Sequence, residues 1–388
     1  MDSDFDFLIV GAGFSGLVLA ERLSTQLGRS SLVVEKRDHI GGNAYDYCDS
    51  AGVRVHKYGP HYFRTNSDRV VQYLSQFTEW HSIEYELRSF TEGKFWHFPI
   101  NLNTFEQLVG RSSTTGEFEK WLKDQRVPIE NPQNSEEVIT SQVGWDLYRR
   151  FYEGYTLKQW RRHPRELASS VCGRVPIRTN RDDRYLSEAF QALPSDGYTN
   201  MFHRLLEAAG EKVTIQLNTN FEEIRNSVSF RHLIYTGPID AYFEHSLGEL
   251  PYRSLRFEFE SFSADQLVER EREHGKPGFW QPFLQVNYPN DHDFTRIVEI
   301  KHATGQECEN STIVREYPEN FGPGTEPYYP IPTKSSEELY RRYRQLASAE
   351  ENVSFVGRLA RYRYYNMDQV VAMALKELEK IVERYGSA

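Results

Sequence analysis

Three glycines and one acidic residue near the start of the chain have the types and the spacing of a dinucleotide site. Gly11, Gly13 and Gly16 follow the pattern G-x-G-x-x-G, and Glu35 stands about 20 residues further on. The first glycine permits a tight turn, the second lets backbone N–H groups approach a pyrophosphate, and the third lets a helix pack closely on a strand. The N-terminus of that helix then faces the phosphates. The Glu35 carboxylate can accept hydrogen bonds from a ribose diol and would repel a 2′-phosphate, so the pattern predicts an adenosine diphosphate site and argues against NADP.

A short charged segment and a second pair of glycines follow this first pattern. Lys36 begins the segment, and Gly41, Gly42 and Asn43 end it. An NAD dehydrogenase does not need paired glycines at this point. The segment resembles the second FAD contact of the amine-oxidase-like flavoproteins, in which the glycines bring backbone against the flavin-side phosphate and the ribityl chain. The sequence therefore favours FAD over NAD.

The elements that position these residues are predicted from the hydrophobic pattern. An apolar run at 5–10, a helical pattern at 13–27 and a second apolar run at 31–34 form a compact β-α-β unit. Asn366 is a suitable N-cap for a late helix, whose N-terminal end carries partial positive charge. The further predicted segments are mainly helix at 103–160, mainly strand at 213–314, a strand at 353–356 and that late amphipathic helix at 367–384.

Composition limits the class of protein. The 388 residues are enough for one large domain or two to three ordinary ones, and the net charge of −10 argues against a nucleic-acid partner. The cysteines, Cys48, Cys172 and Cys308, have neither a disulfide framework nor metal-ligand spacing, so no metal is predicted. The chain has no apolar run of about 18 residues and no signal peptide pattern. We therefore expect a cytoplasmic enzyme with no membrane span.

Word-like motifs from about residue 5 to residue 375 resemble those of the UDP-galactopyranose mutases, a family of flavin-dependent nucleotide-sugar mutases. Several of these strings are rare, and they occur in the family's order. The motifs are HKYGPHYFRT at 56–65, GYTLKQW at 154–160, RVPIR at 174–178, YTGPID at 235–240, LPYRSL at 250–255, FTRI at 294–297, EPYYP at 326–330, GRL at 357–359 and YYNMD at 364–368.

The resemblance implies a mixed α/β (α+β) fold. A Rossmann-like FAD-binding domain is expected to carry an inserted helical domain and an antiparallel sheet domain. The implied divisions are 1–84 for the first segment of the FAD-binding domain, 85–170 for a mainly helical, substrate-lining insertion, 171–215 for the return to the FAD domain and sheet, 216–345 for the antiparallel sheet and substrate region, and 346–388 for the last FAD-binding segment.

The resemblance also implies an isomerase, an intramolecular transferase of cell-wall polysaccharide biosynthesis that interconverts UDP-galactopyranose and UDP-galactofuranose. In this chemistry N5 of reduced FAD attacks the anomeric carbon and expels UDP. The flavin–sugar adduct then opens and recloses before UDP returns. The reaction needs a UDP-sugar substrate and an external reductant for the flavin. Members of the family are often dimers, so a homo-oligomer is expected.

Site residues follow from the motif positions. Arg174, Arg296 and His61 are the implied catalytic residues: the two guanidiniums clamp the leaving diphosphate, and the imidazole lies near the N5/O4 edge of the flavin. Phe151 and Tyr155 are expected against the uracil. The implied substrate contacts are Tyr85, Phe151, Tyr155, Thr156, Trp160, Arg174, Tyr185, Asn287, Arg296, Tyr329 and Tyr364. The implied cofactor contacts are Gly11, Gly13, Phe14, Ser15, Gly16, Glu35, Lys36, Gly42, Asn43, His61, Tyr62, Arg358, Tyr365, Asn366 and Met367.

The chain departs from the family pattern at two positions. Arg64 stands where the family usually has a second histidine, and Arg161 stands where it usually has glycine. Arg64 adds a permanent positive charge that could assist reduced flavin or recognise an acidic group on an altered sugar. Three alternatives therefore stay open. They are a mutase of another nucleotide-linked hexose (deoxy, N-acetyl or uronic), an amine oxidase or flavin desaturase, and a non-catalytic protein that binds FAD and a UDP-sugar.

Overall fold

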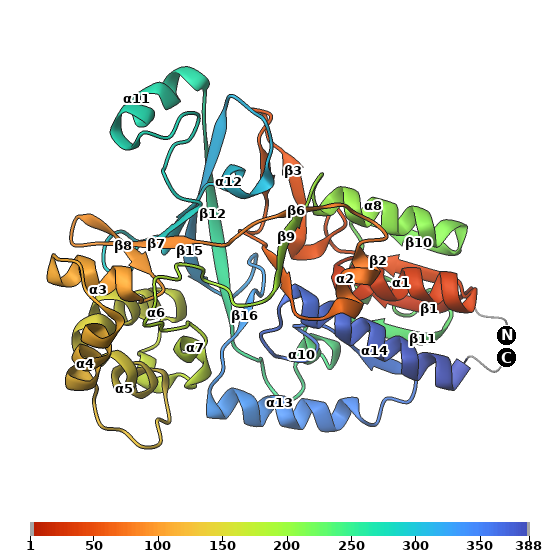
Figure 1. The fold of residues 1–388 in the computed structure, drawn as a ribbon. Helices are drawn as coiled ribbons and strands as arrows, with labels where there is room; N and C mark the ends of the chain where they lie inside the picture. The colour runs from red at the N-terminus through yellow and green to blue at the C-terminus, as the bar shows by residue number, and fades with distance from the viewer. Residues whose placement is uncertain (1–3, 386–388) are drawn as a thin grey trace.

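The computed structural model describes residues 4–385, and its first layer is a sheet of five parallel strands (Figure 1). The strands are short and apolar, and the central ones are buried on both faces, as is usual for parallel sheets. In sheet order they are β10 (Val213–Gln216), β2 (Ser31–Val34), β1 (Phe5–Val10), β11 (Phe230–Tyr235) and β17 (Val353–Phe355). Segments from the start, the middle and the end of the chain thus build one sheet.

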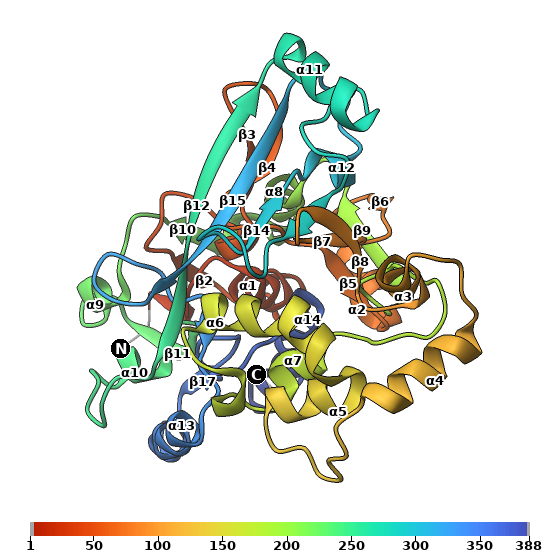
Figure 2. The same ribbon diagram turned by 90° about the vertical axis from the view of Figure 1, so that its left-hand side faces the viewer.

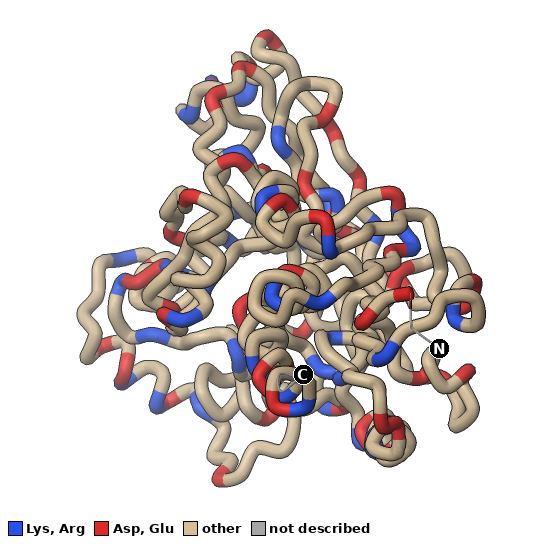
Figure 3. The backbone as a smooth tube through the Cα atoms, turned by 90° about the vertical axis from the view of Figure 1, so that its right-hand side faces the viewer, with Lys and Arg blue, Asp and Glu red and all other residues tan. Residues whose placement is uncertain are grey.

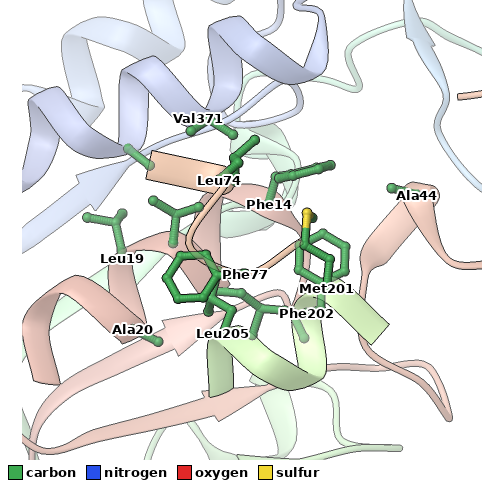
Figure 4. Packing of buried hydrophobic residues seen from close by; sticks show 14 of the residues in the cluster. Phe14, Leu19, Ala20, Ala44, Leu74, Phe77, Met201, Phe202, Leu205 and Val371 are labelled. Carbon is green, nitrogen blue, oxygen red and sulfur yellow. The ribbon is translucent and has the colours of Figure 1, made fainter. Parts of the chain in front are cut away.

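Three helices pack together beside this sheet. They are α1 (Phe14–Leu27), α8 (Tyr198–Ala209) and α14 (Met367–Tyr385), with the short α2 (Asp68–Leu74) against α14. Figure 4 shows their apolar side chains meeting, including Phe14, Phe202 and Val371. Burial of each large apolar side chain contributes roughly 1.5–3 kcal/mol, so this cluster fixes where the N-termini of α1 and α14 lie.

The second layer is a sheet of seven strands. All its pairings are antiparallel except that of β13 with β7. In sheet order the strands are β16 (Tyr329–Pro330), β12 (Tyr252–Phe262), β15 (Ser311–Asn320), β14 (Arg296–Val298), β13 (Gln285–Asn287), β7 (Leu87–Thr91) and β8 (Lys94–Phe98). The long β12–β15 ribbon projects from the body and carries α11 (Ala264–His274) at its tip (Figure 2).

A helical region with its own core lies beside the second sheet. Its buried residues include Trp96, Phe118 and Tyr148. The helices are α3 (Leu102–Val109), α4 (Thr115–Gln125), α5 (Ser135–Tyr148), the π-helical turn η2 (Arg149–Glu153), α6 (Gly154–Trp160), the 3-10 turn η3 (Pro164–Glu166) and α7 (Ser170–Gly173).

Small sheets and short helices complete the fold. The sheet β5–β9–β6 joins Phe63–Thr65, Phe190–Pro194 and Trp80–Ser82, and β3 (Asp46–Cys48) pairs with β4 (Arg54–His56). The remaining helices are η1 (Gly42–Ala44), η4 (Gly210–Lys212), α9 (Phe221–Ile224), α10 (Ile239–Tyr242), α12 (Lys301–Thr304) and α13 (Lys334–Ala347).

The mixed α/β class and the opening β-α-β unit agree with the sequence prediction, but the implied divisions differ from the structure in two places. β11 falls in the range 216–345, yet it pairs with β1 in the parallel sheet. The β7–β8 hairpin falls in the helical range 85–170, yet it belongs to the seven-stranded sheet. Strand pairing over long sequence separations decides both positions.

Figure 3 shows basic and acidic residues interspersed along the backbone on one side of the molecule. The net charge of −10 is therefore not gathered into one acidic face on that side. Among residues 4–385, no helix combines the length and the apolar character that crossing a bilayer requires.

Candidate active site

The glycine turn after β1 brings backbone from three segments together. Gly11 has φ +102° and donates its N–H to Val34 O at 2.8 Å. A Cβ on Gly16 would lie 2.0 Å from Gly11 O, so only glycine lets α1 start this close to the strand end. A Cβ on Gly42 would lie 3.0 Å from the Cα of Gly13, and one on Gly357 would lie 2.8 Å from Ser15 Oγ. The glycines therefore let these backbone segments approach one another closely, and together they form a glycine-lined cradle.

The Glu35 carboxylate braces this cradle. One oxygen accepts from Ala12 N at 2.9 Å and the other from Arg37 N at 3.1 Å, and only 7% of the residue is exposed. A carboxylate offers about four lone-pair sites, so these two bonds leave acceptor capacity for a ribose. Lys36 and Arg37 in turn pair with Glu326 at 2.9 and 3.1 Å. The loop after β2 is thus tied to the β15–β16 connection.

Next to the cradle, a cleft that is partly open to solvent lies among the helical region, the seven-stranded sheet and the N-terminus of α14. It brings together most of the residues that the motifs implied. These are Asn43, His61, Tyr62, Tyr85, Phe151, Tyr155, Thr156, Trp160, Arg174, Tyr185, Asn287, Arg296, Tyr329, Arg358, Tyr364, Asn366 and Met367.

The other implied residues lie elsewhere. Those outside the cleft lining are Gly11, Gly13, Phe14, Ser15, Gly16, Glu35, Lys36, Gly42 and Tyr365. All except Lys36 and Tyr365 belong to the cradle or to the start of α1. The side chain of Phe14 is in the core against Phe202, with ring centroids 4.7 Å apart, so only its backbone is available to a cofactor. The Tyr365 carbonyl accepts two hydrogen bonds from Arg358, at 2.7 and 3.1 Å.

Arg296 is held by a carboxylate that the motifs did not indicate. On β14 its Nε and Nη2 donate to Glu316 of β15 at 2.9 and 2.7 Å, and Glu316 is 1% exposed. The two residues are cross-strand partners. Burial alone would lower the pKa of Arg296, but the Glu316 charge raises it well above its usual value. A ligand in the cleft can therefore meet this permanent cation only through its remaining Nη edge.

A second cationic group surrounds Tyr364. The guanidinium carbons of Arg358 and Arg174 lie 4.9 and 5.2 Å from its ring centroid, and the tilted ring of Tyr329 has its centroid 5.5 Å away. Burial acts to raise the pKa of Tyr364, but the charges of Arg174, Arg358 and Arg64 outweigh it and lower the pKa to about 8. Because 44% of Tyr364 is exposed, solvent screens part of this effect. Such a cluster is suited to an anionic ligand.

His61 is neutral in this site. Burial lowers its pKa to about 3, with a smaller contribution from His56. Its Nδ1 lies 2.8 Å from Gly59 O, which makes Nδ1–H the donor and leaves Nε2 as an acceptor. The backbone N–H of His61 donates to His56 Nδ1 at 3.0 Å. His61 can therefore accept a hydrogen bond or pack against a ring, but it does not supply a positive charge.

Arg64 joins β5 to the N-terminus of α14. Its Nη2 donates to Asn366 Oδ1 at 3.2 Å, and its Nε lies 3.1 Å from Glu188 Oε1. The N–H of Asn366 donates to Gln369 Oε1, which caps the helix start. The arginine that replaces the expected histidine thus aligns the helix end that borders the cleft.

The second departure from the family pattern, Arg161, lies at the C-terminal end of α6. It has φ +51° and ψ 32° at the C-terminal cap of α6, the left-handed conformation that glycine adopts freely. An arginine there costs about 1 kcal/mol relative to glycine. Its side chain is exposed and does not line the cleft.

Sequence reasoning also missed Gln285. Its Oε1 accepts from the Tyr85 hydroxyl at 2.6 Å, and its Nε2 donates to Asn287 Oδ1 at 2.8 Å. Gln285 therefore orients two implied substrate residues from inside the sheet. Like Glu316, it lies outside every motif, and only the strand register brings it to the cleft.

Comparisons with known proteins indicate the same family as the sequence motifs. A family model described as UDP-galactopyranose mutase matches residues 150–364, and one for an NAD(P)-binding Rossmann-like domain matches residues 9–77. A Klebsiella pneumoniae protein with the name "Probable UDP-galactopyranose mutase" is 36% identical over 97% of this chain and 94% of its own.

The chain belongs to the UDP-galactopyranose mutase family.

Two further proteins are similar to this mutase family member over nearly its whole length. A dTDP-fucopyranose mutase of Escherichia coli is 33% identical over 95% of this chain and 96% of its own. A crystal structure of a reduced UDP-galactopyranose mutase has a TM-score of 0.76 at 18% identity, covering 98% of this chain and 96% of that one, which shows the shared fold. The chain is thus an isomerase-type enzyme of this family, with the predicted Rossmann-like fold.

Proposed function

We propose that this enzyme interconverts UDP-galactopyranose and UDP-galactofuranose and that reduced FAD is its working cofactor. The observation that carries the proposal is the cleft itself. Its lining begins at Asn43, next to Gly42 of the dinucleotide cradle, and includes a wall of arginines and tyrosines suited to a diphosphate. Family membership supports the same conclusion.

The residues present fit FAD. The adenosine diphosphate half would lie on the Gly11–Gly16 turn, with Glu35 at the ribose, and the backbone of Gly41 and Gly42 would meet the flavin-side phosphate. The cradle has no room for a side chain at Gly42 or at Gly357, and Gly13 lies beside Gly42. Glycines in such a turn permit the close approach of a pyrophosphate. The buried Tyr62 hydroxyl has no hydrogen-bond partner within residues 4–385, so it can bond to a bound group. When bound and reduced, FAD supplies the nucleophilic nitrogen that carries the sugar during ring contraction.

The chain's own residues must hold the diphosphate as it leaves. Arg174 and Arg296 are charged at every relevant pH, and both line the cleft. Negative charge grows on the departing phosphate, so these cations stabilise the transition state more than the substrate. The phenols of Tyr329 and Tyr364 can donate hydrogen bonds to the same oxygens.

Aromatic residues would hold the rest of the substrate. We assign the uracil to Phe151 and Tyr155 and the sugar to the neighbourhood of Trp160. Phe151 is only 4% exposed and packs on Trp96 and Phe98, so it presents little more than a ring edge. These apolar walls also exclude water from a reactive sugar.

The N-terminus of α14 supplies partial positive charge at the flavin side of the cleft. Asn366 and Met367 line the cleft there. A helix N-terminus stabilises a nearby negative charge by about 0.3–1 kcal/mol, and more where the site is partly buried. We assign it the task of stabilising anionic reduced flavin, with Arg64 holding the helix end in place.

The test is direct turnover. Purified protein reduced with dithionite is incubated with UDP-galactofuranose, and UDP-galactopyranose is measured by chromatography. Protein without reductant and protein stripped of flavin are the controls. Formation of UDP-galactopyranose only in the reduced, flavin-loaded sample is expected. A reduced, flavin-loaded sample that leaves the furanose unchanged would overturn the proposal.

A second candidate is a mutase for a dTDP-linked deoxyhexose. The 33% identity to a dTDP-fucopyranose mutase favours it specifically. The same assay with dTDP-fucofuranose decides between the two, because the enzyme's own substrate will have the larger kcat/KM.

A further inference from the structure

The turn 288–294, which connects β13 to β14, is gathered around one lysine of α6. Lys158 Nζ donates to the carbonyl oxygens of Asp291 at 3.0 Å, His292 at 3.3 Å and Phe294 at 3.0 Å, and also to Tyr288 O. Four carbonyls thus converge on one ammonium, which has three hydrogens to share among them. A point charge on a flexible stem suits this arrangement better than a planar guanidinium.

A second contact seats the same turn on the same helix. A Cβ on Gly154, the first residue of α6, would lie 2.4 Å from Asn290 Oδ1 and 2.5 Å from Pro289 O. Asn290 also donates to Arg150 O and to Thr91 Oγ1, both at 3.0 Å. The turn is therefore docked along α6, at Gly154 and one helical turn later at Lys158.

This docking connects two walls of the cleft. Helix α6 carries Tyr155 and Trp160, while the hairpin whose turn is docked carries Asn287 and Arg296. Arg296 is only two residues beyond Phe294, the last residue of the turn whose carbonyl accepts a hydrogen bond from Lys158. Any shift of the turn relative to α6 therefore changes the distance between the aromatic wall and the guanidinium.

We propose that Lys158 is a positioning residue that sets Arg296 and Asn287 relative to α6 and thereby sets the catalytic geometry for the UDP-sugar. The proposal rests on the proposed function. Lys158 does not line the cleft. A misplacement of about 1 Å at a reacting centre can cost about 10²-fold in rate, so a helix-to-hairpin clamp is sufficient to control turnover.

The experiment uses Lys158→Met, which keeps the stem and removes the ammonium. Lys123→Met, at an exposed lysine of α4, is the matched control. We expect kcat of reduced Lys158→Met to fall roughly 10- to 100-fold. Its KM should change less, because the uridine wall stays on α6, and its flavin content should match wild type. Lys123→Met should behave as wild type.

Gly154→Ala displaces the same turn from its other seat and completes a double-mutant cycle. If both residues act through the turn, the double variant loses little more than the worse single variant. The proposal would be overturned if the kcat losses of the two single variants multiplied in the double variant. It would also be overturned if Lys158→Met were as active as Lys123→Met. If Lys158→Met does not fold, Lys158→Arg takes its place in the cycle and is expected to lose part of kcat at wild-type charge.

The wild-type assay separates this proposal from the proposed function. If reduced wild type turns over UDP-galactofuranose, the cycle tests Lys158 alone. If it does not, the proposed function fails, and the same cycle is measured as UDP affinity by calorimetry. In that case unchanged affinity in both single variants removes the positioning role as well.

Discussion

Replacement of Arg296 by alanine has two separable consequences, because Arg296 faces both the cleft and Glu316. Loss of the guanidinium removes a cation that stabilises charge on the leaving diphosphate. The loss of one such donor in a water-poor site typically lowers kcat by about 10² to 10³. KM should rise less, since the uridine half keeps its aromatic contacts.

The second consequence is a loss of stability. Glu316 is 1% exposed and Arg296 has an 18% exposed side chain, so Arg296→Ala leaves a buried carboxylate unpaired. Removing one partner of a buried ion pair costs about 3–5 kcal/mol. At about 2.1 cal/mol/K per residue, 388 residues have an unfolding entropy of roughly 0.8 kcal/mol/K, so Tm should fall by about 4–6 °C.

The double variant Arg296→Ala/Glu316→Gln separates the loss of catalysis from the loss of stability. The neutral amide no longer needs a counterion, so most of the lost Tm should return while kcat stays low. Tm is measured by calorimetry, and kcat and KM are measured on the reduced enzyme after flavin content is matched. Recovery of kcat together with Tm would mean that Arg296 serves only to neutralise Glu316. A variant with raised KM and intact kcat would make Arg296 a uniform-binding contact.

Three further outcomes are expected. Acid release and chromatography of the purified yellow protein should give FAD and not FMN, because the glycine turn and Glu35 fit an adenosine diphosphate half; a colourless protein that cannot be reconstituted contradicts this. Turnover should require reduced flavin, since N5 of oxidised flavin is an electron-poor imine nitrogen and not a nucleophile. Equal rates under oxidising and reducing conditions would refute the mechanism. A phenol should ionise near pH 8 in absorbance at 295 nm and disappear in Tyr364→Phe, because the pKa of Tyr364 is lowered to about 8. Below that pH the phenol is neutral, and the arginine cluster keeps its full positive charge. Above that pH the phenolate cancels one positive charge, so the wild-type KM for the UDP-sugar should rise above pH 8. The KM of Tyr364→Phe should rise less.

The elements that depend on neighbouring residues could be predicted from the sequence. The strand at 5–10, the glycine turn and the helix after it depend on hydrophobic period and on backbone freedom, which neighbouring residues carry. The predicted late helix at 367–384 is α14, Met367–Tyr385, for the same reason. The rare motif strings brought most of the cleft residues to notice before their positions in space were known.

The predicted helical segment 103–160 is not one regular helix. Val143, Leu147 and Phe151 fall at i, i+4 and i+8, and all three are buried in one core cluster, as that spacing predicts for a helical stripe. The backbone between them is irregular, because Gly144 has φ +78° and residues 149–153 form a π-helical turn. The spacing therefore predicted which side chains are buried but not these local departures from the α-helix.

The sequence by itself determined the dinucleotide turn, the β-α-β unit around it and the motif residues, because each depends on residues close together in the chain. The mixed α/β class followed from the resemblance that those motifs carry. Tertiary structure alone decided that Glu316 faces Arg296, that Gln285 orients Tyr85, and that Lys158 gathers the turn 288–294. These contacts depend on strand pairing and register, where a shift of one residue turns every side chain to the opposite face. Hydrophobic pattern marks a strand, but it does not say which distant strand will lie beside it.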